Sequence, residues 1–446
     1  MDNMQKKLYE DIEAGNEIIP VIWSGDVLVA GGGAAGVAAG AASARKRVKT
    51  MVIEKNSYLG GKVSDSPGLP IEGCFPGYVS QGGIMDELCA KLRFAREDSA
   101  VMADVQGKGV SYYHENEYFK WLSEDILRKS GCCWKLGMTI ENILVEGGRI
   151  KGIIAVQSMK KYAFLAKMVI DATGNGEIAK AAGLLRQNSD DTRFYYPYIL
   201  EDINTDILNN YLKEDRALIK ARERAAKGGV RLGEEDNVEY LNTEIREGKV
   251  YVDSIAVNKK IDMETEDLLE TVHKKLFEHI QFYRRYVPGM EKAVLHRTGE
   301  VIRKLPGKIQ GICQGHKEGY EENGRFQGIL RMETETEGKG QMKLPLGMMI
   351  PQKMDNLLVT GKICDLDDDL REMIGSGHEM VLGQCAGICA AIAFLRGIMP
   401  KELEEEEIHS ILDELGCDIN GDLSRCCKGD KKVMVFSKEY REVEEK

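Results

Sequence analysis

Residues 26–36 of the chain read DVLVAGGGAAG, and this stretch decides the fold. The apolar run predicts a buried strand, the glycines a tight turn, and the small residues after them an alanine-rich helix to about Arg45. A second apolar strand is predicted over Lys49–Glu54. Two strands joined through a helix run parallel, so the segment is predicted to be a βαβ unit.

The glycine spacing G-x-G-x-x-G lies directly after a strand and at the start of a helix, which is the context that gives this pattern meaning. Gly31 permits the tight turn, Gly33 lets the backbone approach a pyrophosphate, and Gly36 allows the helix to pack on the sheet. Glu54 ends the second strand 18 residues after Gly36, where a carboxylate accepts hydrogen bonds from ribose hydroxyls. The alternative is a strand, turn and helix whose small residues serve packing alone, with an incidental glutamate.

The uncharged run Val27–Ala44 is long enough to span a bilayer and contains a GxxxG pattern at Gly36 and Gly40. Consecutive glycines weaken a helix, however, so a buried βα unit explains this run better. The acidic stretch Glu10–Glu17 before it argues against an export signal. We therefore expect a cytoplasmic protein without a membrane partner.

The composition describes a water-soluble globular chain of 446 residues, with 43% apolar and 30% charged residues, long enough for two packed units. The net charge of −11 argues against nucleic acid as the main partner. Eleven cysteines include no CxxC pattern, and without an export signal they are interpreted as reduced thiols. Cys385 and Cys389 share a helical face among apolar residues, which favours packing over metal ligation, and no metal is expected.

The pattern along the chain divides it into five parts. Residues 1–23 are predicted to be an N-terminal extension, and residues 24–182 the first part of a dinucleotide-binding domain. Residues 183–344 have a higher charge density and are predicted to be a second domain, with an amphipathic helix marked by Leu268, Val272, Leu276 and Ile280. Residues 345–398 complete the first domain, and residues 399–446 form a C-terminal helix and tail.

Within the first domain the sequence predicts a helix over Glu115–Lys129 and a short strand around Trp134. Three further strands are predicted over Ile140–Glu146, Arg149–Gln157 and Lys161–Ile170, with a hairpin turn after the first of them. These three strands would form an antiparallel meander inserted in a parallel-sheet protein. The completing segment holds a strand at Leu357–Val359 and a helix over Glu379–Leu395; a further helix is predicted over Glu402–Leu415.

Three further segments carry a resemblance to a known family: 54–61 (EKNSYLGG), 172–176 (ATGNG), and 355–362 (DNLLVTGK) followed by 383–387 (GQCAG). In this order they resemble the FAD-dependent oxidoreductases of the glutathione-reductase-like fold, and in particular the broad bacterial family with an Ala-Thr-Gly-Asp motif. The expected fold class is therefore α/β: a Rossmann-type FAD-binding domain with a parallel sheet and a β-meander, plus an inserted α+β substrate domain.

The resemblance implies a site for non-covalently bound FAD. Gly31, Gly33, Gly36 and Glu54 would hold the ADP half; Gly60, Gly61 and Lys62 would lie along the ribityl chain, and Gly361 would face the pyrophosphate. The backbone near Gly377 would face the flavin pyrimidine, where a helix start stabilises negative charge. The remaining members of the implied cofactor site are Ala34, Ala35, Lys55, Ala172, Thr173, Gly174, Lys362 and His378.

The chain departs from the family pattern at Ala34, where proline is usual, and at Asn175, where aspartate is usual. Neither change removes a backbone contact. Arg371 lies several positions earlier than the arginine of the relatives, which puts the transfer of a catalytic role to it in doubt.

Three residues are candidates for catalysis. His378 would move a proton at the flavin, or it would only cap the helix that begins there. Arg371 and Arg297 would hold an anionic group by paired hydrogen bonds, or they would form structural pairs. Cys74 is either near the flavin or a packed thiol, and the aromatic run Phe194–Tyr198 either lines a pocket or belongs to a core.

The function these patterns favour is an FAD-dependent oxidoreductase that transfers a hydride between FAD and a small organic substrate. One alternative is an NAD-dependent dehydrogenase that uses only the first βαβ unit, and another is a protein whose FAD is structural. A second G-x-G-x-x-G after a strand and a CxxC pattern are both missing from the sequence, which argues against an NADPH-driven dithiol mechanism. The substrate, the electron partner and a homo-oligomeric state are left open.

Overall fold

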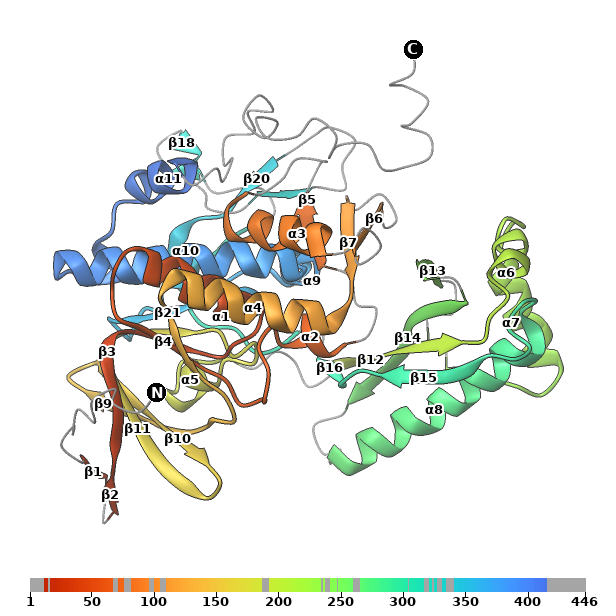
Figure 1. Ribbon diagram of the computed structural model, residues 1–446, viewed down its shortest axis with the longest axis horizontal. Coiled ribbons are helices and arrows are strands. Elements are labelled where there is room, and N and C mark those ends of the chain that lie inside the picture. Colours follow the sequence, from red (N-terminus) through yellow and green to blue (C-terminus); the bar gives the residue numbers. More distant parts are fainter. Residues whose placement is uncertain are drawn as a thin grey trace.

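The computed structural model arranges the chain as two units side by side, a larger α/β unit and a smaller unit built on an antiparallel sheet (Figure 1). The residues that the structure describes are 12–14, 17–66, 71–75, 82–95, 100–104, 110–186, 192–233, 236, 241–246, 248–259, 265–303, 305–316, 321–322, 325–326, 331–333 and 341–414.

The larger unit is built on a seven-stranded sheet in which β11 (Lys160–Asp171) is central. Parallel strands on one side of β11 are β3 (Val21–Ala30), β4 (Thr50–Ile53) and β8 (Cys133–Lys135). On its other side, the second half of β11 pairs in parallel with β21 (Leu357–Val359), in the register Ile170 to Leu358. The predicted βαβ unit and the return of distant sequence to this sheet are both present.

The first half of β11 is part of an antiparallel region of the same sheet. It pairs antiparallel with β10 (Arg149–Gln157), which pairs in turn with β9 (Thr139–Glu146). This is the predicted β-meander. The predicted α/β fold with a parallel sheet and a meander is therefore confirmed.

One face of the parallel sheet is covered by α1 (Ala34–Arg45), α4 (Asn116–Ser130) and α10 (Ser376–Arg396), and α3 (Gly83–Ala95) packs on these three helices (Figure 1). The α1 and α10 backbones touch, because a Cβ at Gly383 would lie 2.0 Å from the Ala35 oxygen, and one at Gly387 would lie 2.2 Å from the Ala39 oxygen. Among the described residues, α10 has the length and apolar character of a membrane span, but 83% of its apolar window is buried inside the protein. It is the central core helix of this unit.

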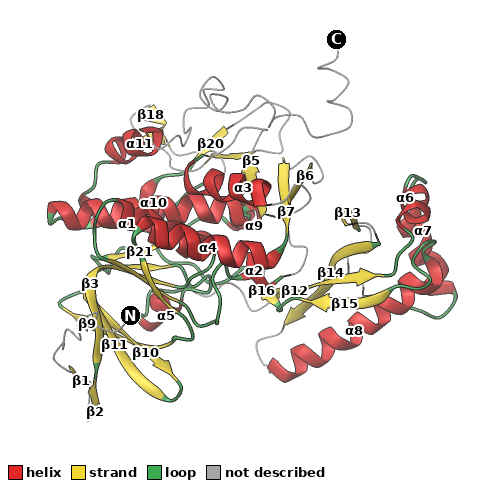
Figure 2. Ribbon diagram, viewed as in Figure 1, coloured by secondary structure: helices red, strands yellow, loops and turns green. Residues whose placement is uncertain are grey.

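The smaller unit has an antiparallel sheet with α8 (Thr265–Tyr286) lying along it (Figure 2). Its strands are β12 (Thr192–Glu201), β13 (Asn242–Arg246), β14 (Lys249–Lys259), β15 (Val294–Thr298) and β16 (Ile302–Arg303). Two further helices are α6 (Thr205–Leu212) and α7 (Ala217–Lys227). The predicted apolar stripe of α8 is buried in this unit's core.

The core of the smaller unit is formed by a shorter stretch of sequence than the predicted substrate domain, 183–344. Its buried members run from Tyr196 to Ala293, whereas Ile309 and Leu344 pack in the core of the larger unit. The chain thus returns to the larger unit soon after β16, about forty residues before the predicted boundary. The high charge density of 305–344 led to its assignment to the second domain, but charge density does not show which core a segment packs against.

The predicted N-terminal extension, 1–23, also differs from what its described part shows. Strands β1 (Ile12–Ala14) and β2 (Glu17–Ile19) form a hairpin, and β3 begins at Val21 rather than near Asp26. Ile19 and Val21 pack on the meander residues Ile154 and Ala163. This part of the chain is therefore joined to the sheet of the larger unit.

The remaining elements lie around this frame. A three-stranded antiparallel sheet is formed by β5 (Ile71–Phe75), β6 (Ala100–Asp104) and β7 (Val110–His114). The short strands are β17 (Glu321–Glu322), β18 (Arg325–Phe326), β19 (Arg331–Glu333) and β20 (Gln341–Lys343). The other helical segments are α2 (Lys62–Asp65), α5 (Glu177–Ala181), η2 (Leu346–Met349), η3 (Gly361–Ile363), α9 (Asp368–Met373), η4 (Pro400–Glu402) and α11 (Glu405–Glu414).

Candidate functional site

A cavity of about 690 Å³ lies at the carboxyl ends of β3, β4, β11 and β21, and residues of the smaller unit form part of its wall. This is the edge of an open α/β sheet at which ligands bind. The predicted cofactor residues that line it are Gly31, Gly33, Ala34, Ala35, Glu54, Lys55, Gly61, Lys62, Ala172, Thr173, Gly174, Gly361 and Lys362. Gly36, Gly60, Gly377 and His378 do not line it.

The three glycines after β3 have three different environments. Gly31 has φ +96°, and a Cβ there would lie 2.4 Å from the Ala172 oxygen. A Cβ at Gly36 would lie 1.8 Å from the Gly31 oxygen, so this glycine lets α1 pack against its own turn. A Cβ at Gly33 would meet no atom within 4 Å, which leaves its backbone open to a ligand at the start of α1.

Glu54 directly follows β4 and is held by backbone donors. Its Oε2 accepts a hydrogen bond from the Gly32 amide at 2.5 Å, and its Oε1 accepts one from the Asn56 amide at 2.8 Å. The side chain is only 5% exposed, yet it lines the cavity. A carboxylate fixed in this way can accept hydrogen bonds from ligand hydroxyls without first being ordered.

The segment after Glu54 folds back onto the first glycine turn. The Gly60 amide donates to the Gly32 oxygen at 2.8 Å, and a Cβ at Gly61 would lie 3.0 Å from the Gly33 Cα. Both residues have positive φ, 95° for Gly60 and 55° for Gly61. Gly60 therefore supports the turn from behind, while Gly61 and Lys62 face the cavity.

Asp171, at the end of β11, is a site-organising residue that the sequence analysis did not single out. It is fully buried and accepts hydrogen bonds from the Thr173 amide at 3.1 Å, the Thr173 hydroxyl at 2.7 Å and the Ala179 amide at 2.9 Å. Burial raises the pKa of Asp171 despite these bonds. It fixes the Ala172–Gly174 loop against α5; its place directly before Ala-Thr-Gly was the available signal.

Two other residues at the cavity were also missed. Glu379, in the first turn of α10, forms an ion pair with Lys62 at 2.9 Å and lies beside Gly361, whose Cβ would be 3.7 Å from the Glu379 Cγ. Thr360, at the end of β21, has a buried hydroxyl with no hydrogen-bond partner among the described residues. Acidic residues at helix starts and threonines at strand ends are common, so neither could be recognised without the fold.

His378 lies at the start of α10, as expected, but its environment is that of a capping residue. Its Nδ1 accepts a hydrogen bond from the Gly375 amide at 3.1 Å, so the ring proton resides on Nε2. The ring packs on Gly73, where a Cβ would lie 2.0 Å from Nδ1. Burial, with a smaller effect of the Lys362 charge, lowers the pKa of His378 to about 4, so the imidazole is neutral near pH 7. These contacts favour the capping alternative over proton transfer.

Arg371 is placed differently from the predicted anion clamp. Its guanidinium is fully buried and donates to the Lys362 oxygen at 2.7 Å, the Asp368 carboxylate at 2.8 Å, the Gly307 oxygen at 3.2 Å and the Pro306 oxygen. With the side chain out of the cavity and engaged by four partners, an anionic substrate has no access to it. The predicted catalytic role is corrected to a structural one.

Arg297 also lies outside the cavity lining. It is in β15 of the smaller unit, and its Nη2 is 3.3 Å from the Asp65 backbone oxygen and 3.6 Å from the Asp65 carboxylate. The pair joins the smaller unit to α2 of the larger one. Of the other candidates, Phe194 lines the cavity while Tyr196 and Tyr198 are buried in the second core; the side chain of Cys74, in β5, lies outside the described residues.

The residues around the cavity fit a flavin dinucleotide. Ligand-facing space is left open at Gly33 and at Gly174, where an added Cβ would meet no atom within 4 Å. The Thr360 hydroxyl is an unpartnered buried group at the wall, and the start of α1 offers free amides to a diphosphate. Backbone amides at a helix start and a fixed carboxylate are the groups that bind the adenosine diphosphate moiety of a dinucleotide.

Fold and cavity together define a dinucleotide-binding α/β protein. The chain belongs to the FAD-dependent oxidoreductase family, whose sequence pattern matches residues 26–304 and 317–412. FAD is thus its cofactor, as the sequence predicted.

Known proteins give a consistent picture of the fold. The chain is similar to a digeranylgeranylglycerophospholipid reductase from Methanosarcina acetivorans, at 27% identity over 168 residues, which span 36% of this chain and 40% of that relative. Among solved structures it is similar to a geranylgeranyl bacteriochlorophyll reductase-like protein from Thermoplasma acidophilum, with TM-score 0.52, 18% identity and coverage of 88% and 84% of the two chains. A flavin-dependent brominase matches with TM-score 0.50, 11% identity and coverage of 95% and 98%.

Proposed function

We propose that this protein is an enzyme that transfers a hydride between a small organic substrate and FAD held non-covalently in the 690 Å³ cavity. The observation that carries the proposal is the cradle at one end of the cavity, where the open Gly33 backbone, the start of α1 and the fixed Glu54 carboxylate converge. Family membership supports the same reading.

The residues of the chain have separate tasks in this proposal. The amides at the start of α1 bind the diphosphate, and Glu54 accepts hydrogen bonds from ribose hydroxyls. Lys62, held by Glu379, lies where it can bind a polar group of the cofactor chain. FAD, when bound, supplies the hydride-accepting and hydride-donating chemistry. The protein supplies binding, orientation and the exclusion of water.

The wall contributed by the smaller unit and its connections favours a substrate with an apolar part. Its members are Leu185, Phe194, Leu268, Leu269, Val301, Ile302 and Pro306, with Glu300 as the charged member. Apolar walls with few polar groups are typical of sites for small organic molecules. An unsaturated isoprenoid chain, the substrate type in the name of the Methanosarcina reductase, is a candidate that this wall would accept.

The proposal is tested by titrating flavin-free protein with FAD and with NADH, followed by anaerobic mixing of the yellow protein with a panel of reduced and oxidised metabolites. Unsaturated isoprenoid alcohols and their saturated forms belong in the panel. We expect tight FAD binding and bleaching or recovery of the flavin band with one substrate class. Binding of NADH alone would favour the NAD-dependent alternative, and flavin that resists photoreduction and every donor would favour a structural role.

A substitution at Glu54 makes the titration specific for this cavity. Glu54→Gln keeps the size of the side chain but removes its charge and replaces one acceptor oxygen by an NH2 group that only donates, so FAD affinity should fall about tenfold. Glu117→Gln, on the exposed side of α4, is the matched control and should leave the affinity unchanged. Equal affinities for the two variants would place the nucleotide elsewhere.

We further propose that the protein is cytoplasmic and forms a homo-oligomer. Its partners in this proposal are small molecules rather than nucleic acids or membranes. The net charge of −11 and the burial of the apolar helix α10 support the proposed location and partners. Sedimentation of the purified protein measures the oligomeric state.

A further inference from the structure

The two units are connected where the chain leaves and re-enters the larger unit, and these two connections touch each other. Arg186 and Lys308 form an antiparallel backbone pair, with N to O distances of 2.7 and 2.9 Å. Gly307 allows this close approach, because a Cβ there would lie 2.7 Å from the Arg186 oxygen. We call Arg186 together with Pro306–Lys308 the neck.

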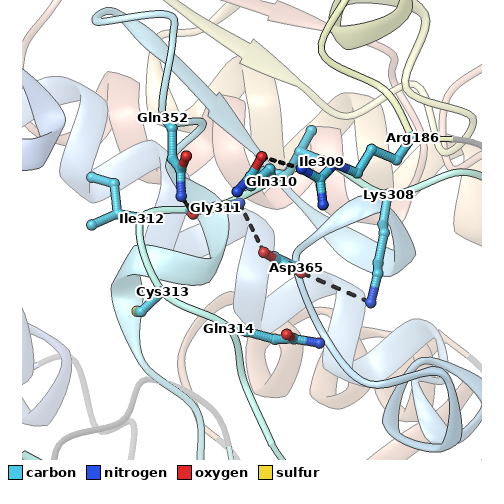
Figure 3. Close-up of a pocket in the computed structure, with 10 residues that line it drawn as sticks. All are labelled: Arg186, Lys308, Ile309, Gln310, Gly311, Ile312, Cys313, Gln314, Gln352 and Asp365. Atoms are coloured by element: carbon cyan, nitrogen blue, oxygen red, sulfur yellow. Dashed lines mark hydrogen bonds and ion pairs between the residues drawn. The ribbon is translucent and has the colours of Figure 1, made fainter.

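The neck borders the flavin cavity on one side and a smaller pocket of about 300 Å³ on the other, which Figure 3 shows. Pro306 and Gly307 line the cavity, whereas Arg186 and Lys308 line the smaller pocket. Lys308 reaches Asp365 at 3.8 Å, as the dashed line in Figure 3 indicates, and donates to the Leu366 oxygen at 2.8 Å. The neck is therefore tied to the chain that follows the Gly361 turn.

Arg371 makes a second and tighter connection between the same two segments. One guanidinium donates to the oxygens of Pro306 and Gly307 in the neck and to the oxygen of Lys362 in the cavity turn, with Asp368 as its counter-ion. A fully buried cation is stable only while all of these acceptors stay in place. The planar fork of arginine can serve acceptors in several directions, which the single ammonium group of lysine cannot do with the same geometry.

We propose that Arg371 is a positioning residue that couples FAD occupancy to the orientation of the smaller unit. A ligand that fixes the turn at Gly361–Lys362 thereby fixes the Lys362 oxygen, hence the guanidinium, and hence the Pro306 and Gly307 oxygens at the neck. The coupling is reciprocal, so a displaced neck weakens binding at the turn. This inference rests on the proposed FAD site and adds a residue that acts on it without touching the ligand.

The test compares the wild-type protein with Arg371→Lys, using FAD titration and hydrogen exchange of neck amides. In the wild type, saturating FAD should slow exchange at the Arg186 and Lys308 amides as well as in the first glycine turn. In Arg371→Lys, the FAD dissociation constant should rise about tenfold, and saturating FAD should protect the glycine turn but no longer the neck. A role in stability alone would not remove a response to FAD.

Arg222→Lys is the matched control, because Arg222 also clamps backbone oxygens, those of Gly233 and Asp236, but does so inside the smaller unit. It should lower stability without changing FAD affinity or the FAD-dependent protection of the neck. Unchanged affinity and unchanged neck protection in Arg371→Lys would overturn the inference. A wild type that binds no FAD would instead refute the proposed function.

A milder variant covers the case in which Arg371→Lys does not fold. Asp368→Asn removes only the counter-ion, whose side chain is 56% exposed. It should weaken FAD binding in the same direction and reduce the protection of the neck. The wild type alone is also decisive: FAD that protects the glycine turn but leaves exchange at the neck unchanged would contradict the coupling.

Discussion

At the scale of single residues, the turn after β3 shows how one residue type meets three requirements. Gly31 needs a positive φ, Gly36 needs the absence of a Cβ against a carbonyl, and Gly33 needs neither for folding. Gly33 has φ −65°, a value that any residue adopts, and faces open space. We therefore expect a requirement for glycine at this position to come from the ligand rather than from the fold.

This difference predicts opposite outcomes for two alanine substitutions. Gly33→Ala should leave the thermal midpoint unchanged and lower FAD affinity about tenfold or more, because the methyl group enters the space of the diphosphate. Gly36→Ala should lower the thermal midpoint, because its Cβ would lie 1.8 Å from the Gly31 oxygen. Thermal unfolding with and without FAD separates the two; a destabilised Gly33→Ala with normal affinity would contradict the assignment.

The cofactor residues could be predicted from the sequence because they belong to short motifs with fixed spacing. Most of the predicted set lines one cavity, although the motifs are distant in sequence. The catalytic candidates could not be predicted in the same way. Arg371 is buried among carbonyl oxygens and His378 caps a helix, and neither environment follows from local sequence. Burial and partners depend on tertiary contacts that a motif does not encode.

At the scale of elements, the contact between α1 and α10 depends on glycine in the second helix. Gly383→Ala should destabilise the protein by about 1–3 kcal/mol, because a Cβ there would lie 2.0 Å from the Ala35 oxygen and would force the helices apart. Leu395→Ala, at a position of α10 that is 59% exposed, is the control and should change stability by less than about 0.5 kcal/mol. Urea unfolding measures both, and equal effects would contradict the close packing.

Elements with strong periodicity were predicted well. Helix α4 and the strands of the meander lie within a few residues of their predicted bounds, because each has a clear apolar pattern and a turn signal. The small sheet of β5, β6 and β7 was not predicted, since β5 is separated from the other two strands by α3 and pairs with a distant segment. The boundary near 344 was wrong because surface charge does not show which core a segment joins.

In the core of the smaller unit, Lys275 and His279 of α8 contact the buried Asp236, and this cluster predicts that stability depends on pH. Asp236 lies 3.1 Å from the His279 Nε2 and 3.1 Å from the Lys275 Nζ, and His279 Nδ1 lies 3.3 Å from the Tyr198 hydroxyl. Burial by itself would raise the pKa of Asp236, but the hydrogen bond and charge of His279, the Ala256 amide and Lys275 together lower it.

Because the folded pKa of Asp236 is lowered, its contribution to stability is present above the ordinary value of about 4 and is lost as the pH falls through the lowered value. The thermal midpoint of the smaller unit should therefore fall more steeply below about pH 4 in the wild type than in Asp236→Asn. The variant should be less stable at neutral pH, since it leaves buried partners uncompensated. Parallel pH profiles for the two proteins would contradict this role of Asp236.

At the scale of the whole molecule, the pair Arg297 and Asp65 is a charged contact between the two units in the part of the chain that the structure describes. Arg297 and Asp65 are 3.6 Å apart with side chains 39% and 23% exposed, so Arg297→Ala should cost at most about 1 kcal/mol. The same variant should keep its FAD affinity and its turnover with any substrate found, because the arginine does not line the cavity. A large loss of kcat would restore the catalytic role that the sequence suggested for Arg297.

The shared strand β11 has a consequence for how the chain is made. The second half of β11 pairs with β21, and α1 packs against α10. Both β21 and α10 follow the whole of the smaller unit in the sequence. On a ribosome, the smaller unit is complete while the larger one still exposes a bare strand edge and an uncovered helix. Unpaired edges of this kind recruit other chains. The segment from β21 to α10, which is synthesised after the smaller unit, is therefore expected to protect the newborn protein from aggregation.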